Sequence, residues 1–183
     1  MPNEAPSLEP AVVLCEEDTP CTVTLEASDD GVPGALSGSV VTAPLRGELA
    51  TFSGLTVVYT PNAGEIGEDS FRVSVSDGAL ESDSVTIRLR VVSRRSCAHL
   101  LLSGGASGSG IYDLSPSGPA GPTFSAYCDM SREGGGWTLA LKVDGREQTF
   151  AYASALWTNG TLHDDTATSL DDSEAKLAPF TSL

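Results

Sequence analysis

Short apolar runs alternate with turn signals over the first 93 residues. Residues that tolerate a left-handed backbone, or that hydrogen-bond to their own backbone, stand at Asp29-Asp30-Gly31, Pro61-Asn62-Ala63-Gly64 and Asp77-Gly78. No helical periodicity interrupts this pattern. The expected strands lie at residues 11–14, 22–27, 39–43, 48–52, 55–60, 70–76 and 84–92. Short strands at this spacing predict a β-sandwich over residues 11–93.

The second half of the chain also begins with period-two alternation. Residues 110–114 and 123–128 alternate on either side of a Ser/Pro/Gly-rich loop at 115–122, which predicts a β-hairpin. The hairpin leads into Gly134-Gly135-Gly136. Consecutive glycines suit a backbone that turns through positive φ or lies against another chain segment, so this turn is expected to be structural.

The residues after the glycines predict a further strand. Trp137, Leu139 and Leu141 alternate with polar or small residues, as in a strand with one buried face, and Trp137 is expected to be a core anchor. Near the end of the chain, residues 171–177 are predicted to form a short helix that stops before Pro179, because Asp and Ser at its start favour an N-cap.

Charge narrows the classes of partner. The chain of 183 residues has 25 Asp and Glu against 10 Lys and Arg, a net charge of −15. This excess of acidic residues argues against nucleic-acid binding by phosphate neutralisation.

No apolar run approaches the length of a transmembrane segment, and the polar, proline-rich start lacks the apolar core of a signal peptide. We therefore expect an excerpt of a longer exported protein, with linkers at 1–10 and 94–96.

Four cysteines fall as one close pair in each half, Cys15 with Cys21 and Cys97 with Cys128. An even number of cysteines suits disulfides, and no Cys-x-x-Cys or Cys/His cluster has zinc spacing. The sequence alone allows three connectivities, of which pairing within each half is the least demanding. Four free thiols in a cytosolic protein are the alternative.

Several motifs of the first half share a pattern. They are Glu17-Asp18-Thr19-Pro20, Thr42-Ala43-Pro44, Gly47-Glu48-Leu49, Tyr59-Thr60-Pro61-Asn62-Ala63-Gly64, Gly67-Glu68-Asp69-Ser70-Phe71 and Ser76-Asp77-Gly78. The region resembles the bacterial cadherin-like, immunoglobulin-like repeats found in tandem on long surface proteins. The resemblance implies a stalk or adhesive spacer. Cys15 and Cys21 depart from its pattern, and we interpret them as a local staple of an exposed edge.

Calcium is the one cofactor that the first half suggests, since some repeats of this kind bind it through acidic loops at their ends. Carboxylates in the expected turns are the candidate ligands, because Ca²⁺ takes six to eight oxygen ligands. They are Glu17, Asp18, Asp29, Asp30 and Asp77. The simpler interpretation is that these residues form turns on a solvated acidic surface.

A second set of motifs lies in the other half. They are Ser96-Cys97, Ser109-Gly110-Ile111-Tyr112, Tyr127-Cys128-Asp129-Met130 and Gly134-Gly135-Gly136-Trp137-Thr138-Leu139. Their order and spacing resemble the opening of a fibrinogen-related domain, with an intelectin-like triple glycine. The resemblance implies a Cys97–Cys128 disulfide and a secreted, non-enzymatic, lectin-like module. A full domain of this family is much longer than residues 97–183, so we expect a partial domain and carry over no ligand-binding residue.

An enzymatic role has little support in the sequence. His163-Asp164-Asp165 could suggest an acid-base or metal cluster, but it lies in a stretch with turn composition, and the other histidine, His99, stands beside Cys97. Asn159-Gly160-Thr161 fits a glycosylation sequon, and its Asn-Gly pair is also a turn signal.

The sequence thus predicts a mainly β chain in which an immunoglobulin- or cadherin-like β-sandwich precedes a truncated α+β fibrinogen-like domain. We expect an extracellular, secreted or cell-surface segment that binds a glycan or an extracellular protein. Two alternatives stay open: a structural spacer of a long surface protein, and an accessory region of a secreted hydrolase.

Overall fold

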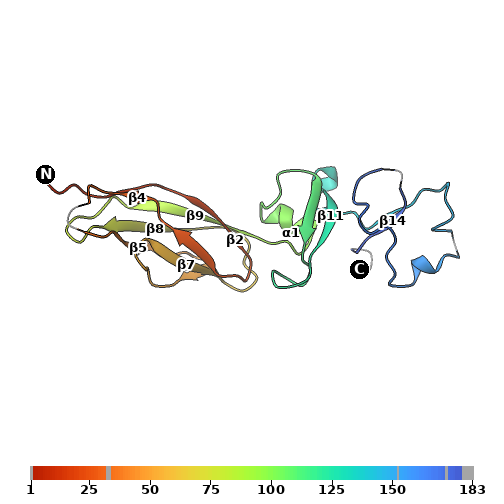
Figure 1. Ribbon diagram of the computed structural model, residues 1–183, viewed down its shortest axis with the longest axis horizontal. Helices are drawn as coiled ribbons and strands as arrows, with labels where there is room; N and C mark the ends of the chain where they lie inside the picture. The colour runs from red at the N-terminus through yellow and green to blue at the C-terminus, as the bar shows by residue number, and fades with distance from the viewer. Residues whose placement is uncertain (1, 32–33, 152, 172, 179–183) are drawn as a thin grey trace. The chain divides into compact units, whose positions relative to one another are not determined.

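The computed structural model describes residues 2–31, 34–151, 153–171 and 173–178. The chain divides into two compact units, the first ending at Ser93 and the second beginning at Arg94. In Figure 1 the first unit carries strands, and the second carries helix α1 with several short strands. The predicted mainly β fold class is confirmed.

Two sheets make up most of the first unit. The larger has the strand order β2-β9-β8-β5 and the smaller the order β3-β7-β6. The strands are β2 (Val12–Glu16), β9 (Val85–Val92), β8 (Gly67–Ser76), β5 (Ser37–Thr42), β3 (Cys21–Thr24), β7 (Thr56–Pro61) and β6 (Gly47–Leu49). Each strand expected from the hydrophobic pattern overlaps one of these, so the predicted sandwich is confirmed.

Inward-facing side chains of both sheets form a single core. Tyr59 of β7, Phe71 of β8 and Ile87 of β9 are among its fully buried members. Because successive side chains of a strand point to opposite faces, residues between the core positions, such as Arg72 and Arg88, face solvent. Burial of each large apolar side chain contributes about 1.5–3 kcal/mol.

Residues 2–10 differ from the expected linker. β1 (Ser7–Leu8) pairs with β4 (Ala27–Ser28), and Leu8 is buried against the core. The Asn3 side-chain amide donates a hydrogen bond to Asp77 Oδ2 at 3.0 Å. These residues are therefore part of the sandwich, and a two-residue strand is too short to show periodicity in the sequence.

A partly buried carboxylate, that of Asp69, joins β8 to the smaller sheet. It accepts hydrogen bonds from the backbone N–H groups of Leu45, Arg46 and Ser70 at 3.1, 3.0 and 2.8 Å, and from the Tyr59 hydroxyl at 2.9 Å. Burial opposes ionisation, but these donors outweigh it and hold the pKa of Asp69 below its ordinary value. Burial and the Asp69 charge raise the pKa of Tyr59.

The Cys15–Cys21 disulfide links the sheets of the first unit. Cys15 lies on β2 and Cys21 on β3, which are edge strands of the larger and the smaller sheet, and their Cα atoms are 5.5 Å apart. The loop between them buries Glu17, whose Oε1 accepts a hydrogen bond from the Ser93 hydroxyl at 2.9 Å. The disulfide therefore joins the edge strands of the two sheets. The loop that it closes is in turn hydrogen-bonded to Ser93, at the end of the unit.

The second unit opens with α1 (Cys97–Leu102) and the sheet β10-β11-β12. β10 (Gly110–Leu114) and β11 (Phe124–Asp129) form an antiparallel hairpin, as predicted. β12 (Trp137–Thr138) pairs with the end of β11. Helix α1 was not predicted, because six residues are too few to show a helical period, although Ser96 is a sequence signal for its N-cap.

The later part of the second unit is held by β13 (Leu141–Lys142) and β14 (Ala175–Lys176), which are antiparallel. Short 3-10 turns occur at η1 (Arg132–Gly134) and η2 (Ala155–Trp157). The helix predicted over residues 171–177 is wrong for the described residues. Ala175 and Lys176 instead pair with β13, and Lys176 also forms a β-bridge with His163. The expected stop at Pro179 lies outside the described residues.

Candidate recognition surface

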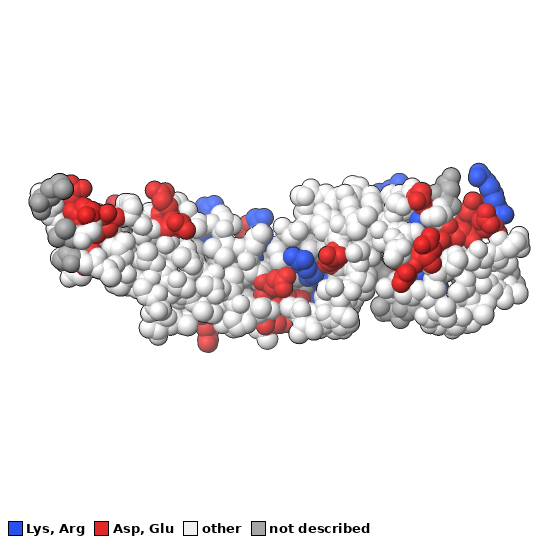
Figure 2. Space-filling model, in the orientation of Figure 1, with Lys and Arg blue, Asp and Glu red and all other residues white. Residues whose placement is uncertain are grey.

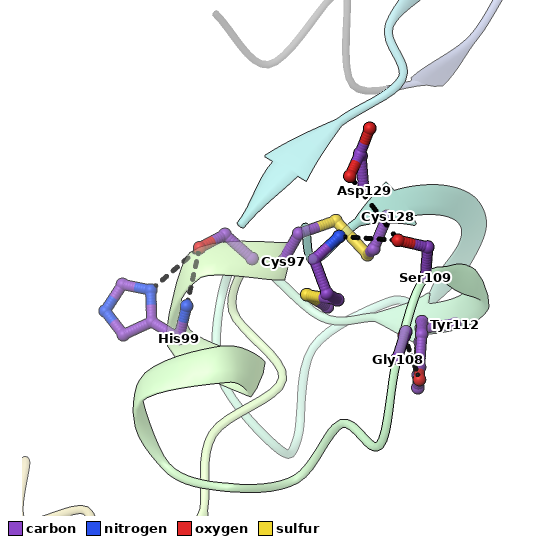
Figure 3. Close-up of a disulfide and its surroundings, with 9 residues drawn as sticks. Cys97, His99, Gly108, Ser109, Tyr112, Cys128 and Asp129 are labelled. Atoms are coloured by element: carbon purple, nitrogen blue, oxygen red, sulfur yellow. Dashed lines mark hydrogen bonds between the residues drawn. A yellow bond between two sulfur atoms is a disulfide. The ribbon is translucent and has the colours of Figure 1, made fainter. Parts of the chain in front are cut away.

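A buried disulfide organises the start of the second unit. Cys97, the first residue of α1, is bonded to Cys128 of β11, with the Cα atoms 5.4 Å apart (Figure 3). Both cysteines are completely buried, with Leu100, Leu114 and Ala126 around them. The expectation of two disulfides is thus confirmed, and no free cysteine occurs in the described residues, which include all four.

The helix next to this disulfide is capped by its neighbours in sequence. The Ser96 hydroxyl accepts a hydrogen bond from the His99 backbone N–H at 3.2 Å and lies 2.9 Å from His99 Nδ1 (Figure 3). At the other end, the Ser103 hydroxyl donates to the His99 carbonyl at 2.7 Å. His99 is thus a capping partner of the helix rather than part of a chemical cluster.

The serine- and glycine-rich loop that follows is tied to the hairpin. The Tyr112 hydroxyl donates to the Gly108 carbonyl at 2.7 Å, and the Met130 backbone N–H donates to Ser109 Oγ at 2.9 Å (Figure 3). Ser109 in turn donates to Asp129 Oδ1 at 3.4 Å. This loop is a fastened spacer, with no strand-to-helix turn of the kind that presents a nucleophile.

The glycine triplet makes the structural turn that its sequence predicts. Gly134, Gly135 and Gly136 have φ values of +93°, +78° and +82°. A Cβ on Gly135 would lie 2.3 Å from the Met130 carbonyl oxygen, and one on Gly136 would lie 2.8 Å from Ala98 Cα. The turn therefore combines a left-handed backbone with close approach to α1 and to the end of β11.

Trp137 does not anchor the core as the alternation predicted. Its side chain is 56% exposed, and its indole N–H donates to the Arg132 carbonyl at 3.0 Å. Lys142, at an alternate position expected to be exposed, is buried instead. β12 comprises only Trp137 and Thr138, and β13 begins at Leu141 in another sheet, so the period-two pattern spans two short strands rather than a continuous one.

Hollows flank the exposed indole. One, of about 560 Å³, is lined by Asp129, Arg132, Glu133 and Trp137. The other, of about 520 Å³, includes the exposed Leu170. Hydrogen bonds from the Ser131 backbone and hydroxyl, with help from Arg132, lower the pKa of Asp129. An aromatic face fixed by a hydrogen bond thus lies between ionised groups of both signs.

Replacing Trp137 by alanine is expected to lower the free energy of unfolding by no more than about 1 kcal/mol, because little of the indole is buried. Leu114→Ala is the matched control, since Leu114 is 1% exposed in the same unit and should cost about 2–5 kcal/mol. Urea unfolding followed by tryptophan fluorescence measures both, with Trp157 as the remaining tryptophan in the Trp137→Ala variant. If both variants lost the same free energy of unfolding, Trp137 would be a core residue after all.

The burial of Lys142 could not be expected from the sequence pattern. Lys142 Nζ donates to Asp171 Oδ1 at 2.7 Å, to Ser173 Oγ at 2.6 Å and to the Ser169 carbonyl at 3.1 Å. Lys142, with the Ser173 and Ser169 hydroxyls, holds the pKa of Asp171 well below its ordinary value. The cluster fastens β13 to the segment before β14, which favours strand pairing of Ala175 and Lys176 over the predicted helix.

The other residues considered for chemistry have structural roles. The His163 ring makes an edge contact with the buried Phe150, their centroids 5.9 Å apart, and its backbone bridges to Lys176. The carbonyl oxygen of the Asn159 side chain accepts a hydrogen bond from the Thr161 N–H at 3.1 Å, as expected of a turn. Neither histidine is in a cluster suited to catalysis among the described residues.

The structure separates the acidic residues proposed as calcium ligands. Asp77 directly follows β8, whereas Glu17 lies beside Ser93, which follows β9; these strands are antiparallel, so the two acids lie at opposite ends of the larger sheet. Asp18 accepts from the Gly64 N–H at 2.8 Å. Asp29 accepts from Gly31 N–H at 3.1 Å.

The remaining carboxylates also cap backbone groups. Asp77 Oδ1 accepts from the Ala79 and Leu80 N–H groups, each at 2.7 Å, and Asp30 accepts from the Glu4 N–H at 3.2 Å. Within the described ranges, no three His, Cys, Asp or Glu side chains are grouped so as to hold a metal ion. In the same part of the chain, no helix is long and apolar enough to cross a membrane.

The first unit is a two-sheet β-sandwich, and the second begins with a helix and a hairpin that are joined by a disulfide. Residues 3–90 match the family model of the bacterial Ig domain. Residues 93–160 match that of the C-terminal globular domain of fibrinogen beta and gamma chains. Both resemblances drawn from the sequence motifs are therefore confirmed.

A curated relative supports the same assignment. The chain is 33% identical to tenascin from Mus musculus over 95 residues, which are 46% of this chain and 4% of tenascin. The chain thus corresponds to a small part of that protein's length.

Proposed function

We propose that this segment serves extracellular recognition, with the first unit as a stalk repeat and the second as part of a lectin-like, fibrinogen-type binding module. The observation that carries the proposal is the order of the two matches, a bacterial Ig domain followed by a fibrinogen domain, each with its own disulfide. Disulfides persist in oxidising surroundings outside the cytosol. The proposal assigns no catalytic step to the chain.

The geometry of the first unit supports the stalk role. The chain enters beside Asp77, where Asn3 donates to its carboxylate, and leaves after Ser93 at the opposite end of the larger sheet. A sandwich whose ends lie far apart can be joined in tandem with others without crossing itself. This feature also favours the second candidate, a purely structural spacer.

The surface around Trp137 supports the binding role. Aromatic rings that keep one face accessible are enriched at recognition surfaces, because they supply a large apolar area with few rotatable bonds. Asp129, Arg132 and Glu133 surround this ring with acceptors and donors. A glycan or a polar protein loop, each with apolar and hydrogen-bonding groups side by side, matches such a surface.

A binding screen tests the proposal. The whole chain and its Trp137→Ala variant would be applied to an array of neutral and acidic glycans and to immobilised extracellular matrix proteins. We expect the chain to bind a subset, with binding at least about tenfold weaker for the variant, since aromatic residues dominate binding energy at interfaces. Absence of binding to the whole set would reject the recognition role and favour the spacer.

A further inference from the structure

The basic residues of the first unit gather near one face of the larger sheet. Up to Ser93 the chain has fifteen acidic and four basic residues, and the basic ones are all arginines. Arg72, Arg88 and Arg90 stand on β8 and β9, and Arg46 precedes β6. Figure 2 shows far more acidic than basic side chains on the face in view. These arginines therefore form a locally basic region on a unit that is acidic as a whole.

Strand register places Arg88 between an apolar residue of β2 and a serine of β8. Arg88 on β9 pairs with Val12 of β2 on one side and with Ser70 of β8 on the other. Thr86, two positions earlier on β9, shares its face, because the side-chain period of a strand is two. The face thus offers a guanidinium with two hydroxyls and an apolar residue as its neighbours.

These side chains surround a surface hollow of about 470 Å³. Among its lining residues are Val12, Arg46, Ser70, Thr86, Arg88 and Arg90. Val12 is 66% exposed and stands on β2, next to the equally exposed Leu14, so apolar surface forms one rim. The hollow is therefore bounded by arginines, hydroxyl groups and the carboxylates of Glu68 and Asp69 on one side, and by aliphatic groups at its edge.

Acidic neighbours do not neutralise the whole hollow. Glu68 pairs with Arg90 at 3.0 Å, and Glu65 pairs with Arg46 at 3.5 Å. The oxygens of Asp69 are already occupied by its four hydrogen-bond donors. Within the part of the chain that the structure describes, the Arg88 guanidinium makes no hydrogen bond or ion pair.

The hydroxyls beside Arg88 are equally available. Neither the Ser70 nor the Thr86 hydroxyl has a hydrogen-bond partner among the described residues. A guanidinium has five N–H donors and no acceptor, and it matches carboxylate or sulfate oxygens in a bidentate manner. Donors in excess of acceptors are the arrangement that an anion requires.

We propose that this face of the first unit binds an acidic polysaccharide, with Arg88 on a carboxylate or sulfate group and with Ser70 and Thr86 on neighbouring oxygens. Val12 and Leu14 would pack against the C–H faces of the sugar rings. The site lies in the first unit, so it goes beyond the recognition role proposed for the fibrinogen-like unit and does not depend on it.

An acidic peptide fits this face less well. Peptides that bind sheets usually do so by adding a strand to an open edge, through backbone hydrogen bonds. Here the donors are side chains on the face of the sheet, and β8 and β9 are interior strands whose backbone groups are paired. A ligand that presents many oxygen acceptors and few donors, as an acidic polysaccharide does, suits the face better.

The test measures binding of the whole chain and its Arg88→Gln variant to heparin, polygalacturonate and neutral dextran by calorimetry at low ionic strength. Heparin and polygalacturonate separate sulfate from carboxylate recognition. We expect one or both to bind, dextran not to bind, and Arg88→Gln to weaken binding at least about tenfold, since hydrogen bonds to charged groups are strong. Arg88 is exposed, so the variant should fold normally.

Arg72→Gln is the matched control, because it removes the same charge from the same sheet. The Arg72 guanidinium donates to Ser84 and does not line the hollow. Its affinity should fall by no more than about twofold, in keeping with screened attraction at a distance. If both variants weakened binding of the polysaccharide equally, the attraction would be due to net charge alone, and the proposed site would be wrong. Competition by polyglutamate as strong as that by polysaccharide, or no binding to either acidic polymer, would also overturn the site.

Discussion

Replacing Cys97 and Cys128 together by alanine is expected to lower the free energy of unfolding of the second unit by about 3 to 4 kcal/mol. The bond closes a loop with a sequence separation of 31, and such a loop restricts the unfolded chain strongly. Both cysteines also belong to a small buried cluster with Leu100, Leu114 and Ala126. Because folded domains are stable by only about 5–15 kcal/mol, this loss should be large relative to the total.

Both tryptophans of the chain, Trp137 and Trp157, lie in the second unit, so their fluorescence in urea follows that unit alone. The control replaces Cys15 and Cys21, whose separation is 6. It should cost about 2 kcal/mol in the first unit and leave the tryptophan transition in place. A tryptophan transition that does not move when Cys97 and Cys128 are replaced would contradict the structural role of this bond.

The parts of the fold that the sequence predicted are those with local and repeated signals. Strands such as β7 and β9 alternate over several residues, and the turns between strands carry Asp, Asn and Gly. The β10-β11 hairpin has both features. β1 and α1 were missed because each is too short to show a period, and because β1 depends on β4, some twenty residues away.

The surroundings of Trp137 could be predicted only in part. The glycine turn follows from its own composition, since few other residues adopt positive φ readily. The exposure of Trp137 does not, because alternation indicates two faces without saying which of them another segment covers. Lys142 shows the same limit: its burial depends on Asp171 and Ser173, about thirty positions away.

The proposed calcium ligands illustrate a further limit. Asp and Glu in loops are the ligands of calcium, and they are also the residues that cap turns. Composition cannot separate these roles, and the structure shows directly only the capping of turns. Asp77 accepts from Ala79 and Leu80 within its own turn, and Asp18 from the backbone of Gly64. Their oxygens thus serve backbone groups at separate places in the sandwich.

Alanine substitutions in the glycine triplet are expected to destabilise the second unit in a graded order. Gly135→Ala and Gly136→Ala should cost about 3 kcal/mol or more each, because a strained left-handed backbone is combined with overpacking. The new Cβ would lie 2.3 Å from the Met130 carbonyl oxygen in the first case and 2.8 Å from Ala98 Cα in the second. Both contacts are with backbone atoms, which cannot move aside as a flexible side chain can.

Gly134 and Gly160 separate the two contributions. Gly134 has φ +93° but open space around its Cβ position, so Gly134→Ala should show the backbone strain alone, about 1–2 kcal/mol. Gly160 also has open space and no positive φ, so Gly160→Ala should be within about 0.5 kcal/mol of the parent. Urea unfolding followed by tryptophan fluorescence ranks the four variants. If Gly135→Ala and Gly134→Ala cost the same, the close approach to Met130 contributes nothing, and the turn needs glycine for its φ values alone.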